Sequence, residues 1–258
     1  MLSGRTSLRG LPYDTIKEKI VDFIKKEVGG KKAVIGLSGG IDSSLTAYFA
    51  VSSLGKEKVL GLIMPESTST PYEDIRDALA LASWLGINYR IMYIDGILRS
   101  YVSNFDIVDK KALGNLKARI RMSILYYFAN VNDAIVTGTG DKSEIYLGYF
   151  TKYGDGGVDI LPIGDVYKTE VRELAVHFNI PETITSKKSS PRLWPGQTAE
   201  DELGITYEVA DKILHELIDI KVPEKEIVTK YGENASRIIE LMRSSEHKRR
   251  MPPIAFLE

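Results

Sequence analysis

Short apolar runs alternate with helical patterns along the first part of the chain, and few folds accommodate that order. The predicted strands span 33–37, 59–64, 89–94, 134–137 and 158–161, and the predicted helices between them span 41–54, 72–85 and 110–131. Strands that alternate with helices form parallel sheets that are covered by helices on both faces. We therefore expect an α/β fold with a doubly wound, open parallel sheet of about five strands.

Helical patterns also flank this alternating region. An amphipathic pattern spans 12–28, and the C-terminal part carries helical patterns at 166–178, 206–219, 223–231 and 233–246. The segment 185–204 lies among them and is polar and rich in proline and glycine. A loop of that length inside a compact domain is usually functional or disordered, and we expect a lid that is mobile without ligands and closes when they bind. No repeat or linker is evident, and we expect one domain over residues 1–258.

Charge and composition exclude several classes of protein. The 34 Lys and Arg residues nearly balance the 35 Asp and Glu residues, and a net charge of −1 argues against a dedicated nucleic-acid binder. The chain contains no cysteine, which excludes disulfides, thiolate metal sites and a Cys nucleophile. No apolar run approaches the roughly 18 residues that a membrane helix needs. We therefore expect a cytoplasmic protein that binds neither membranes nor nucleic acid.

The first candidate site is the loop Ser38-Gly39-Gly40-Ile41-Asp42-Ser43-Ser44, between a predicted strand and a predicted helix. Glycines let backbone N–H groups converge, and a helix N-terminus adds partial positive charge, so an anion should bind there. The loop lacks the lysine of a Walker loop and carries Asp42 instead. A carboxylate beside a phosphate needs a cation between them, and Mg²⁺ is the natural bridge.

The loop resembles the SGGxDS loop of the N-type ATP pyrophosphatases. In that superfamily the loop holds the pyrophosphate that is released when ATP adenylates a substrate. The resemblance implies an adenine nucleotide alpha hydrolase-like fold for this chain.

A second candidate site follows the predicted strand at 134–137. Thr139 offers a hydroxyl and Glu144 offers a hard oxygen ligand, whereas Lys152 and Lys168 bring positive charge to anionic ligands. Asp155 stands between glycines, where a carboxylate could orient a small amine. The whole run from Gly138 to Thr169 closely resembles ammonia-dependent NAD synthetase, and the resemblance extends over nearly the whole chain.

The resemblance implies ATP-dependent amidation of deamido-NAD by ammonia, through an adenylated intermediate, in a homodimer with the dinucleotide site at its interface. It assigns Asp42, Glu144, Asp155 and Lys168 to catalysis, and Asp42 and Glu144 to Mg²⁺. The positions that match ATP contacts are Gly36, Leu37, Ser38, Gly39, Gly40, Ile41, Asp42, Ser43, Thr139, Lys168 and Ser190. The positions that match deamido-NAD contacts are Arg119, Lys152, Asp159, His247 and Lys248.

Two positions depart from the family pattern. Asp141 stands where the family usually has Asn, so we expect more negative charge in the second site. The run Ser189-Ser190-Pro191-Arg192 replaces a more usual Pro-Ser-Ala-Gly, which weakens the assignment of Ser190.

Two other functions remain open. One is a different ATP pyrophosphatase that modifies tRNA, although such enzymes need a basic RNA surface or catalytic cysteines. The other is a nucleotide-binding sensor without turnover, although the full set of Asp42, Glu144 and Lys168 argues against an inactive site. For the homodimer, we expect the helix at 110–131 to supply the interface, through its apolar residues Ile120, Ile124, Leu125, Tyr127 and Phe128.

Overall fold

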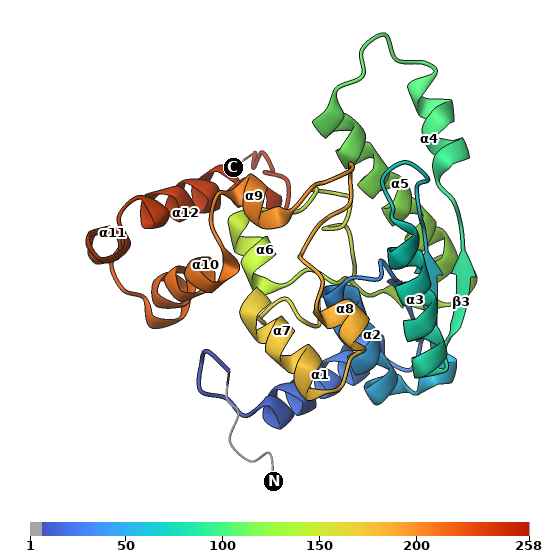
Figure 1. Cartoon of the computed structure of the whole chain (residues 1–258), viewed down its shortest axis with the longest axis horizontal. Helices are drawn as coiled ribbons and strands as arrows, with labels where there is room; N and C mark the ends of the chain where they lie inside the picture. Colours follow the sequence, from blue (N-terminus) through green and yellow to red (C-terminus); the bar gives the residue numbers. More distant parts are fainter. Residues whose placement is uncertain (1–6, 258) are drawn as a thin grey trace.

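The computed structural model describes residues 7–257, and its centre is a parallel sheet (Figure 1). Four strands lie in the order β3-β2-β1-β4, namely β1 Lys32–Gly36, β2 Val59–Ile63, β3 Asn88–Ile91 and β4 Ala134–Val136. Val34 of β1 lies opposite Leu60 of β2 and Val136 of β4. The chain runs outward from β1 to β3 and then returns to β4 on the other side of β1. The carboxyl ends of β1 and β4 therefore form a topological switch point, where such sheets bind ligands.

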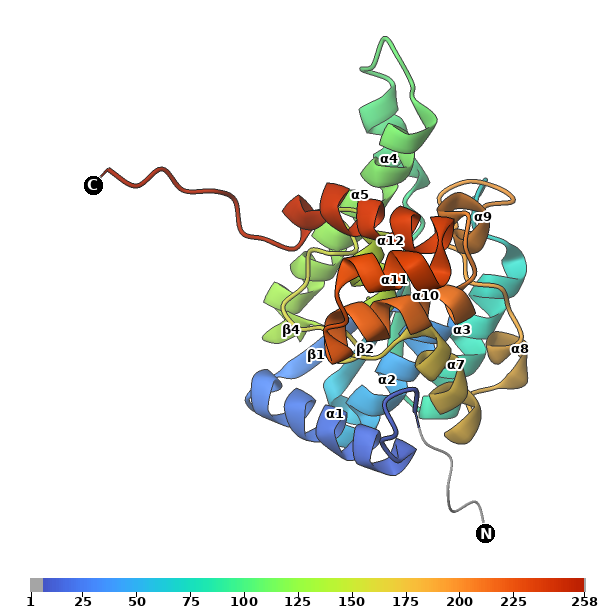
Figure 2. The same ribbon diagram turned by 90° about the vertical axis from the view of Figure 1, so that its left-hand side faces the viewer.

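Helices cover both faces of the sheet, as expected. One face carries α1 Tyr13–Val28, α2 Ile41–Leu54, α3 Tyr72–Leu85 and α7 Lys168–His177, and the other carries α4 Asp95–Val102 and α5 Lys110–Val131. Neighbouring residues of β1 point to opposite faces: Ile35 packs with the first set and Val34 with the second. Figure 2 shows the sheet between α1 on one side and α5 on the other.

The prediction of a fifth strand at residues 158–161 is wrong. Of residues 158–161, only Ile160 pairs with the sheet, in an isolated parallel bridge to Thr137. The Asp159 carboxylate accepts a hydrogen bond from Val136 N at 2.7 Å, so a side chain takes a place that a main-chain carbonyl would fill in a ladder. A turn from Leu161 to Gly164 then ends the extended segment.

The C-terminal helices form a cluster of their own beside the sheet (Figures 1 and 2). Its elements are α6 Lys142–Leu147, α9 Ala199–Leu203, α10 Tyr207–Leu214, a π-helical continuation His215–Ile220, α11 Glu224–Tyr231 and α12 Glu233–Ser244. The short helix α8 Glu182–Thr185 packs instead with α2 and α7. They enclose a separate apolar core that includes Tyr207, Ile213 and Ile238. This core is separate from the two cores that flank the sheet, so a single domain over residues 1–258 remains a prediction. Within residues 7–257, no helix has both the length and the apolar character for crossing a membrane.

Candidate active site

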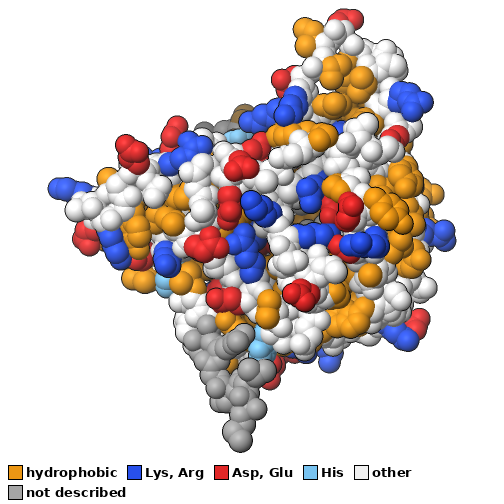
Figure 3. Space-filling view, in the orientation of Figure 1, with side chains coloured by type: hydrophobic (Ala, Val, Ile, Leu, Met, Phe, Trp, Pro, Cys, Tyr) orange, Lys and Arg blue, Asp and Glu red, His pale blue; other side chains and the backbone are white. Residues whose placement is uncertain are grey.

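A cavity of about 720 Å³ opens at the carboxyl ends of β1 and β4. Its walls come from the loop after β1, from α5, from the segment after β4 and from residues 187–194. Figure 3 shows Lys and Arg side chains intermingled with Asp and Glu side chains across the middle of this face. The sequence-predicted residues that line the cavity are Gly36, Leu37, Ser38, Gly40, Ile41, Asp42, Ser43, Thr139, Glu144, Asp155, Ser190 and Lys248.

The loop after β1 is shaped for an anion. Gly39 has φ +74°, and a Cβ at that position would lie 2.1 Å from the backbone oxygen of Asp74, so only glycine fits there. Ser43 Oγ donates to Gly40 O at 3.1 Å and holds the turn together. Because α2 begins at Ile41, its first backbone N–H groups have no partner within the helix and can donate to a bound phosphate.

Lys168 lies at the centre of a buried charge cluster. Its Nζ is 2.7 Å from Asp42 Oδ1, 2.7 Å from Asp141 Oδ2 and 2.9 Å from Glu144 Oε1. The side chains of Lys168 and Asp141 are fully buried, whereas those of Asp42 and Glu144 are 23% and 21% exposed. Elements distant in sequence therefore bring together three of the four residues predicted to be catalytic.

Burial and like-charge repulsion both act on this cluster. Burial raises the pKa of Asp141 to about 6, with repulsion from Asp42 adding to the effect and attraction to Lys168 opposing it. Burial raises the pKa of Glu144 well above its usual value, again with Lys168 opposing the shift. The three carboxylates lift the pKa of Lys168 well above its usual value, although burial alone would lower it. The ammonium therefore stays charged.

Asp141 has a structural role that the sequence signalled only as a departure from the family pattern. Its Oδ1 accepts a hydrogen bond from Glu144 N at 2.8 Å, and the Glu144 carboxylate reaches back to Asp141 N, which forms a capping box at the start of α6. Aspartate at this position therefore begins the helix and also pairs with Lys168.

The charge balance of the cluster fits a divalent cation. Three carboxylates face one ammonium, and the two partly exposed ones, Asp42 and Glu144, line the cavity. No group of three or more His, Asp or Glu side chains in residues 7–257 is arranged to hold a metal unaided. Mg²⁺ commonly takes one or two protein carboxylates and completes its shell with phosphate and water, so these two residues are suitable ligands beside a bound nucleotide.

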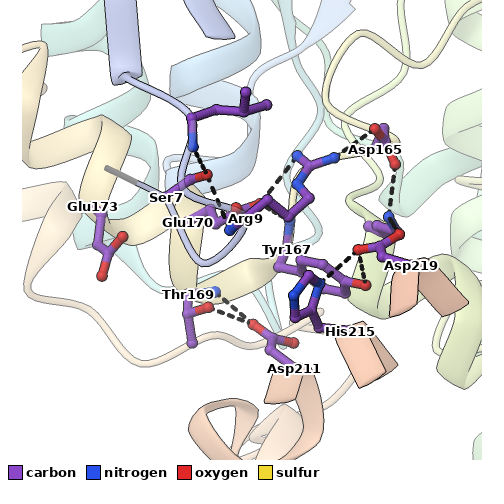
Figure 4. Close-up of polar contacts among 12 residues, drawn as sticks. Ser7, Arg9, Asp165, Tyr167, Thr169, Glu170, Glu173, Asp211, His215 and Asp219 are labelled. Atoms are coloured by element: carbon purple, nitrogen blue, oxygen red, sulfur yellow. Dashed lines mark hydrogen bonds and ion pairs between the residues drawn. The ribbon is translucent and has the colours of Figure 1, made fainter. Parts of the chain in front are cut away.

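A hydrogen-bond chain holds the backbone of Lys168. Lys168 N donates to Ser143 Oγ at 2.9 Å, and Ser143 Oγ donates to Asp211 Oδ1 at 2.5 Å. The other oxygen of Asp211 accepts from both N and Oγ1 of Thr169 at 2.8 Å (Figure 4). Asp211 thereby ties α10 to the first turn of α7, where Lys168 stands. Sequence reasoning missed this residue, because nothing local to Asp211 signals a partner 42 positions away.

A second polar cluster joins α6, the residue before α7 and the π-helical segment His215–Ile220 (Figure 4). Asp219 accepts hydrogen bonds from Lys142 Nζ at 2.6 Å and from Tyr167 OH at 2.9 Å, and His215 Nδ1 lies 2.9 Å away. Burial would raise the pKa of Asp219, but Lys142, His215 and Tyr167 lower it to about 2. Asp165 connects this cluster to Arg9, which comes from the other end of the chain.

The residues predicted to bind deamido-NAD fall into two groups. Arg119 Nη2 donates to Lys152 O at 3.3 Å, and Lys152 Nζ donates to His247 O at 2.6 Å, so these residues and Lys248 are neighbours beside the cavity. Lys248 Nζ donates to two backbone carbonyls of the segment after α6, at 2.7 and 2.8 Å. Asp159 is separate, because its carboxylate is bound to Tyr126 OH and to the backbone of β4.

Asp155 faces the cavity from the segment after α6. Its Oδ1 accepts a hydrogen bond from Thr151 N at 2.9 Å, which orients the carboxylate. Enclosure by the surrounding walls raises the pKa of Asp155 above its usual value, although hydrogen bonds from the backbone and attraction to Lys248 oppose the shift.

The segment predicted as a lid lies against the cavity and is held by ion pairs. Lys187 Nζ is 2.7 Å from Asp74 Oδ1 and 2.6 Å from Asp77 Oδ2, and Arg192 Nε is 2.9 Å from Asp74 Oδ2. Ser190 Oγ donates to Gln197 O at 2.6 Å within the segment. The two aspartates of α3 were not foreseen, since their position on a helix indicates only a polar face.

Comparisons with known proteins show which family the chain resembles. The family model described as NAD synthase matches residues 16–252. An NH(3)-dependent NAD(+) synthetase from Hyperthermus butylicus is 50% identical over 253 residues, which cover 95% of this chain and 92% of the relative. The solved structure of an NMN synthetase from Francisella tularensis aligns with a TM-score of 0.85 at 33% identity, over 95% of this chain and 99% of that one.

A further solved structure, an NH3-dependent NAD synthetase from Campylobacter jejuni in complex with nitrate, aligns with a TM-score of 0.82 at 33% identity. The alignment covers 95% of this chain and 100% of that one. These similarities extend over nearly the whole chain, and the two solved structures share its fold. The chain belongs to the NAD synthase family.

Proposed function

We propose that this chain is an ammonia-dependent NAD synthetase, a ligase that converts deamido-NAD, ATP and ammonia into NAD, AMP and pyrophosphate. The observation that carries the proposal is that the loop after β1 and the carboxylates of Asp42 and Glu144 line one cavity, and that the buried Lys168 forms ion pairs with both carboxylates. Membership of the NAD synthase family leaves no support for a tRNA-modifying enzyme. The sensor without turnover is left for the assay below.

In the first step an oxygen of the nicotinate carboxylate attacks the α-phosphorus of ATP, and the bond to pyrophosphate breaks. This step brings an anion toward a polyanion, so positive charge must be in place beforehand. The N–H groups at the start of α2 hold the departing pyrophosphate, and Lys168 adds a fixed charge nearby. Asp42 and Glu144 would hold Mg²⁺, which neutralises phosphate charge when bound.

In the second step ammonia attacks the carbonyl carbon of the adenylate, and AMP leaves. Asp155 receives hydrogen bonds from the nitrogen and takes the proton that the new amide loses. Its pKa is raised above the usual value, which makes the carboxylate a better proton acceptor than an ordinary aspartate. Residues 187–194 border the cavity and would limit the entry of water, which would otherwise hydrolyse the adenylate.

The remaining roles come from the resemblance and from the layout of the cavity. Thr139 and Ser190 contact ATP, and the neighbouring residues Arg119, Lys152, His247 and Lys248 contact deamido-NAD. Asp159 contacts deamido-NAD only if its bonds to Tyr126 and β4 rearrange. We further propose that the protein is one domain and acts in the cytoplasm as a homodimer, without membrane or nucleic-acid partners.

The basis for the homodimer differs from the one that the sequence suggested. Ile120 and Ile124 of α5 are 4% and 7% exposed and pack in the core of this chain, so the expectation that they form the interface is wrong. They face the sheet because α5 covers it directly. Other apolar residues are exposed on β3, in and just before α4, and on α5, namely Tyr89, Ile91, Tyr93, Ile97, Tyr101, Tyr127 and Val131. They support an interface along β3, α4 and the C-terminal end of α5.

One similar structure suggests a second substrate. The protein from Francisella tularensis is described as an NMN synthetase, so the substrate amidated here could be the mononucleotide with a nicotinate ring. Relatives that are 44–50% identical are described as NAD synthetases, and this favours the dinucleotide.

The deciding experiment measures NAD and pyrophosphate formed by the purified chain with ATP, Mg²⁺ and ammonium. Deamido-NAD should support turnover, with a larger kcat/KM than nicotinate mononucleotide. Glutamine without ammonium should give no product, because this chain has no cysteine to hydrolyse it. Binding of ATP without release of its pyrophosphate, in the presence of either deamido-NAD or nicotinate mononucleotide, would indicate a sensor. A larger kcat/KM for the mononucleotide would favour NMN synthesis instead.

A further inference from the structure

Arg121 is a cation of the cavity wall to which the family resemblance assigns no role. It lies on α5 and lines the cavity together with Asn115, Ala118, Met122 and Leu125 of the same helix. Arg119 lies two positions earlier and points instead to Lys152 beside the cavity. Arg121 is therefore the arginine of this helix that faces the space where substrates bind.

The guanidinium of Arg121 is held at one end and has spare donors at the other. Its Nε donates to the carbonyl of Met64 at 2.8 Å, just after β2. That bond uses one of five N–H donors and leaves both Nη groups for a ligand. Within residues 7–257, no carboxylate forms an ion pair with Arg121, whereas Lys187 and Arg192 of the same cavity pair with Asp74.

A largely buried charge without a partner is costly, so it calls for an explanation. Burial lowers the pKa of the Arg121 guanidinium, and attraction to Glu66, Asp155 and Asp95 opposes the shift without restoring it. Glu66 is already bound by Lys117 at 2.7 Å, and Asp95 accepts from Ser67 N. An anionic group of a bound substrate would supply the missing partner, and a planar guanidinium suits a carboxylate that accepts two parallel bonds.

The position of Arg121 distinguishes between the anionic groups available. The phosphate-binding loop starts α2, on one face of the sheet, whereas Arg121 comes from α5 on the other face. Asp155, the candidate ammonia site, lines the same cavity, and its carboxylate attracts the guanidinium of Arg121. Ammonia and the acyl group must meet at one carbon, so a cation near Asp155 is suited to hold the acyl end of the substrate.

We propose that Arg121 binds the nicotinate carboxylate of the acyl substrate and distinguishes it from the uncharged amide of the product. This inference rests on the proposed function, since it concerns the same cavity. A carboxylate approaching Asp155 would otherwise meet like charge, and the guanidinium removes that penalty. After amidation the ion pair is lost, so the product binds more weakly and leaves.

Binding of deamido-NAD and of NAD to the full-length chain tests the proposal, since the two ligands differ only in carboxylate against amide. Calorimetry should show that the wild-type chain binds deamido-NAD about 10–100-fold more tightly, the range expected of charge-assisted hydrogen bonds. In Arg121→Gln the two affinities should become nearly equal, with little change for NAD or ATP. Arg121→Lys, which keeps the charge but loses the fork, should retain part of the preference.

Lys212→Gln is the matched control. It removes one positive charge from an exposed position on α10 and should leave the preference unchanged. The proposal is overturned if Arg121→Gln still binds deamido-NAD more tightly than NAD. If that variant also loses affinity for ATP, Arg121 would instead bind a phosphate.

The wild-type protein also gives a test that needs no variant to fold, because equal affinities for deamido-NAD and NAD would overturn the proposal. A wild-type chain that binds neither dinucleotide would contradict the proposed function itself. Binding with a preference that survives Arg121→Gln overturns only the role of Arg121.

Discussion

At the scale of single residues, many contacts hold the buried positive charge of Lys168. Its ammonium is fully buried and is surrounded by three carboxylates, and its backbone N–H is held through Ser143 and Asp211. Burying a lysine is favourable only when such partners surround it. The arrangement therefore fixes a positive charge next to the cavity and leaves Asp42 and Glu144 partly exposed to it.

Asp42→Asn should lower the kcat for pyrophosphate release by about 10²–10³-fold, the usual effect of removing one charge stabiliser from a transition state. The fold should persist, because Lys168 keeps its ion pairs with Asp141 and Glu144. Steady-state kinetics at saturating Mg²⁺ and a thermal melt of the same sample provide the measurement.

The control for this variant is Asp22→Asn, which removes a carboxylate from an exposed position on α1. It should leave both kcat and the melting temperature unchanged. If Asp42→Asn turned over at the wild-type rate, Asp42 would have no part in adenylation.

At the scale of elements, a buried ion pair connects three parts of the cavity wall. Lys117 Nζ of α5 lies 2.7 Å from Glu66 Oε2 in the turn after β2, and it also donates to Leu193 O at 3.1 Å in the segment predicted as a lid. Both side chains of the pair are 6% exposed. Burial would raise the pKa of Glu66, but hydrogen bonds from Lys117, Ser69 and Thr68 lower it to about 2.

Glu66→Gln should lower the free energy of unfolding at pH 7 by about 3–5 kcal/mol, because it leaves Lys117 buried without its counter-ion. The folded-state pKa of Glu66 lies below the unfolded value of 4.5, so the wild-type advantage is complete above pH 4.5 and is lost as the pH falls towards 2. Urea unfolding of both proteins between pH 7 and pH 3 measures the difference.

The comparison for Glu66 is Glu224→Gln, which breaks an ion pair with Arg243 in which both side chains are at least half exposed. That change should cost less than about 1 kcal/mol at any of these pH values. A difference for Glu66→Gln that did not shrink in acid would show that the ion pair is not its cause.

The segment 185–204 should become more protected when ATP and deamido-NAD bind together. Its anchors to α3 pair the partly exposed Lys187 and Arg192 with the buried Asp74, and bound substrates would add contacts to Ser190 and Arg192. The Trp84→Phe protein leaves Trp194 as the single tryptophan, and its ring lies 4.5 Å from Lys110 Nζ of α5. We expect both substrates together to shift Trp194 emission and to slow proteolysis of the segment.

Each substrate alone is the control for this closure, and each should give a smaller change. Lys187→Met, which removes the contacts to Asp74 and Asp77, should speed proteolysis in the absence of substrates. Emission and proteolysis that respond to neither substrate would show that the segment is not a lid.

At the scale of the whole molecule, the prediction concerns assembly. We expect a homodimer at micromolar concentration, because apolar side chains are exposed along β3, α4 and the end of α5. Val131→Asp, at a position that is 66% exposed at the end of α5, should shift the sedimentation coefficient to that of a monomer. Val176→Asp, at a position that is 54% exposed on α7, is the matched control and should not.

A wild-type chain that sediments as a monomer would refute the dimer. A Val131→Asp protein that remains dimeric would place the interface elsewhere on the surface.

The local pattern of residues was enough to locate the sheet and the loop between β1 and α2. Apolar runs matched β1, β2, β3 and β4 to within a few residues, and the glycines and Asp42 after β1 indicated an anion site at the start of a helix. These features depend on the chemistry of neighbouring residues, and neighbours are visible in a sequence. Glu144 and Lys168 were candidates in the second site, and the fold brings both to Asp42.

Packing settled the features that depend on residues far apart in the chain. Residues 158–161 have a strand-like composition. However, the Asp159 carboxylate accepts the hydrogen bond of Val136 N in β4, and the pairing is limited to one bridge. Ile120 was expected at an interface and lies in the core, because periodicity shows that a helix has an apolar face but not what covers it. Asp211 and Arg121 were not foreseen for the same reason. The role of a charged residue depends on its burial and on the partners that the fold brings to it, and neither has a local signal.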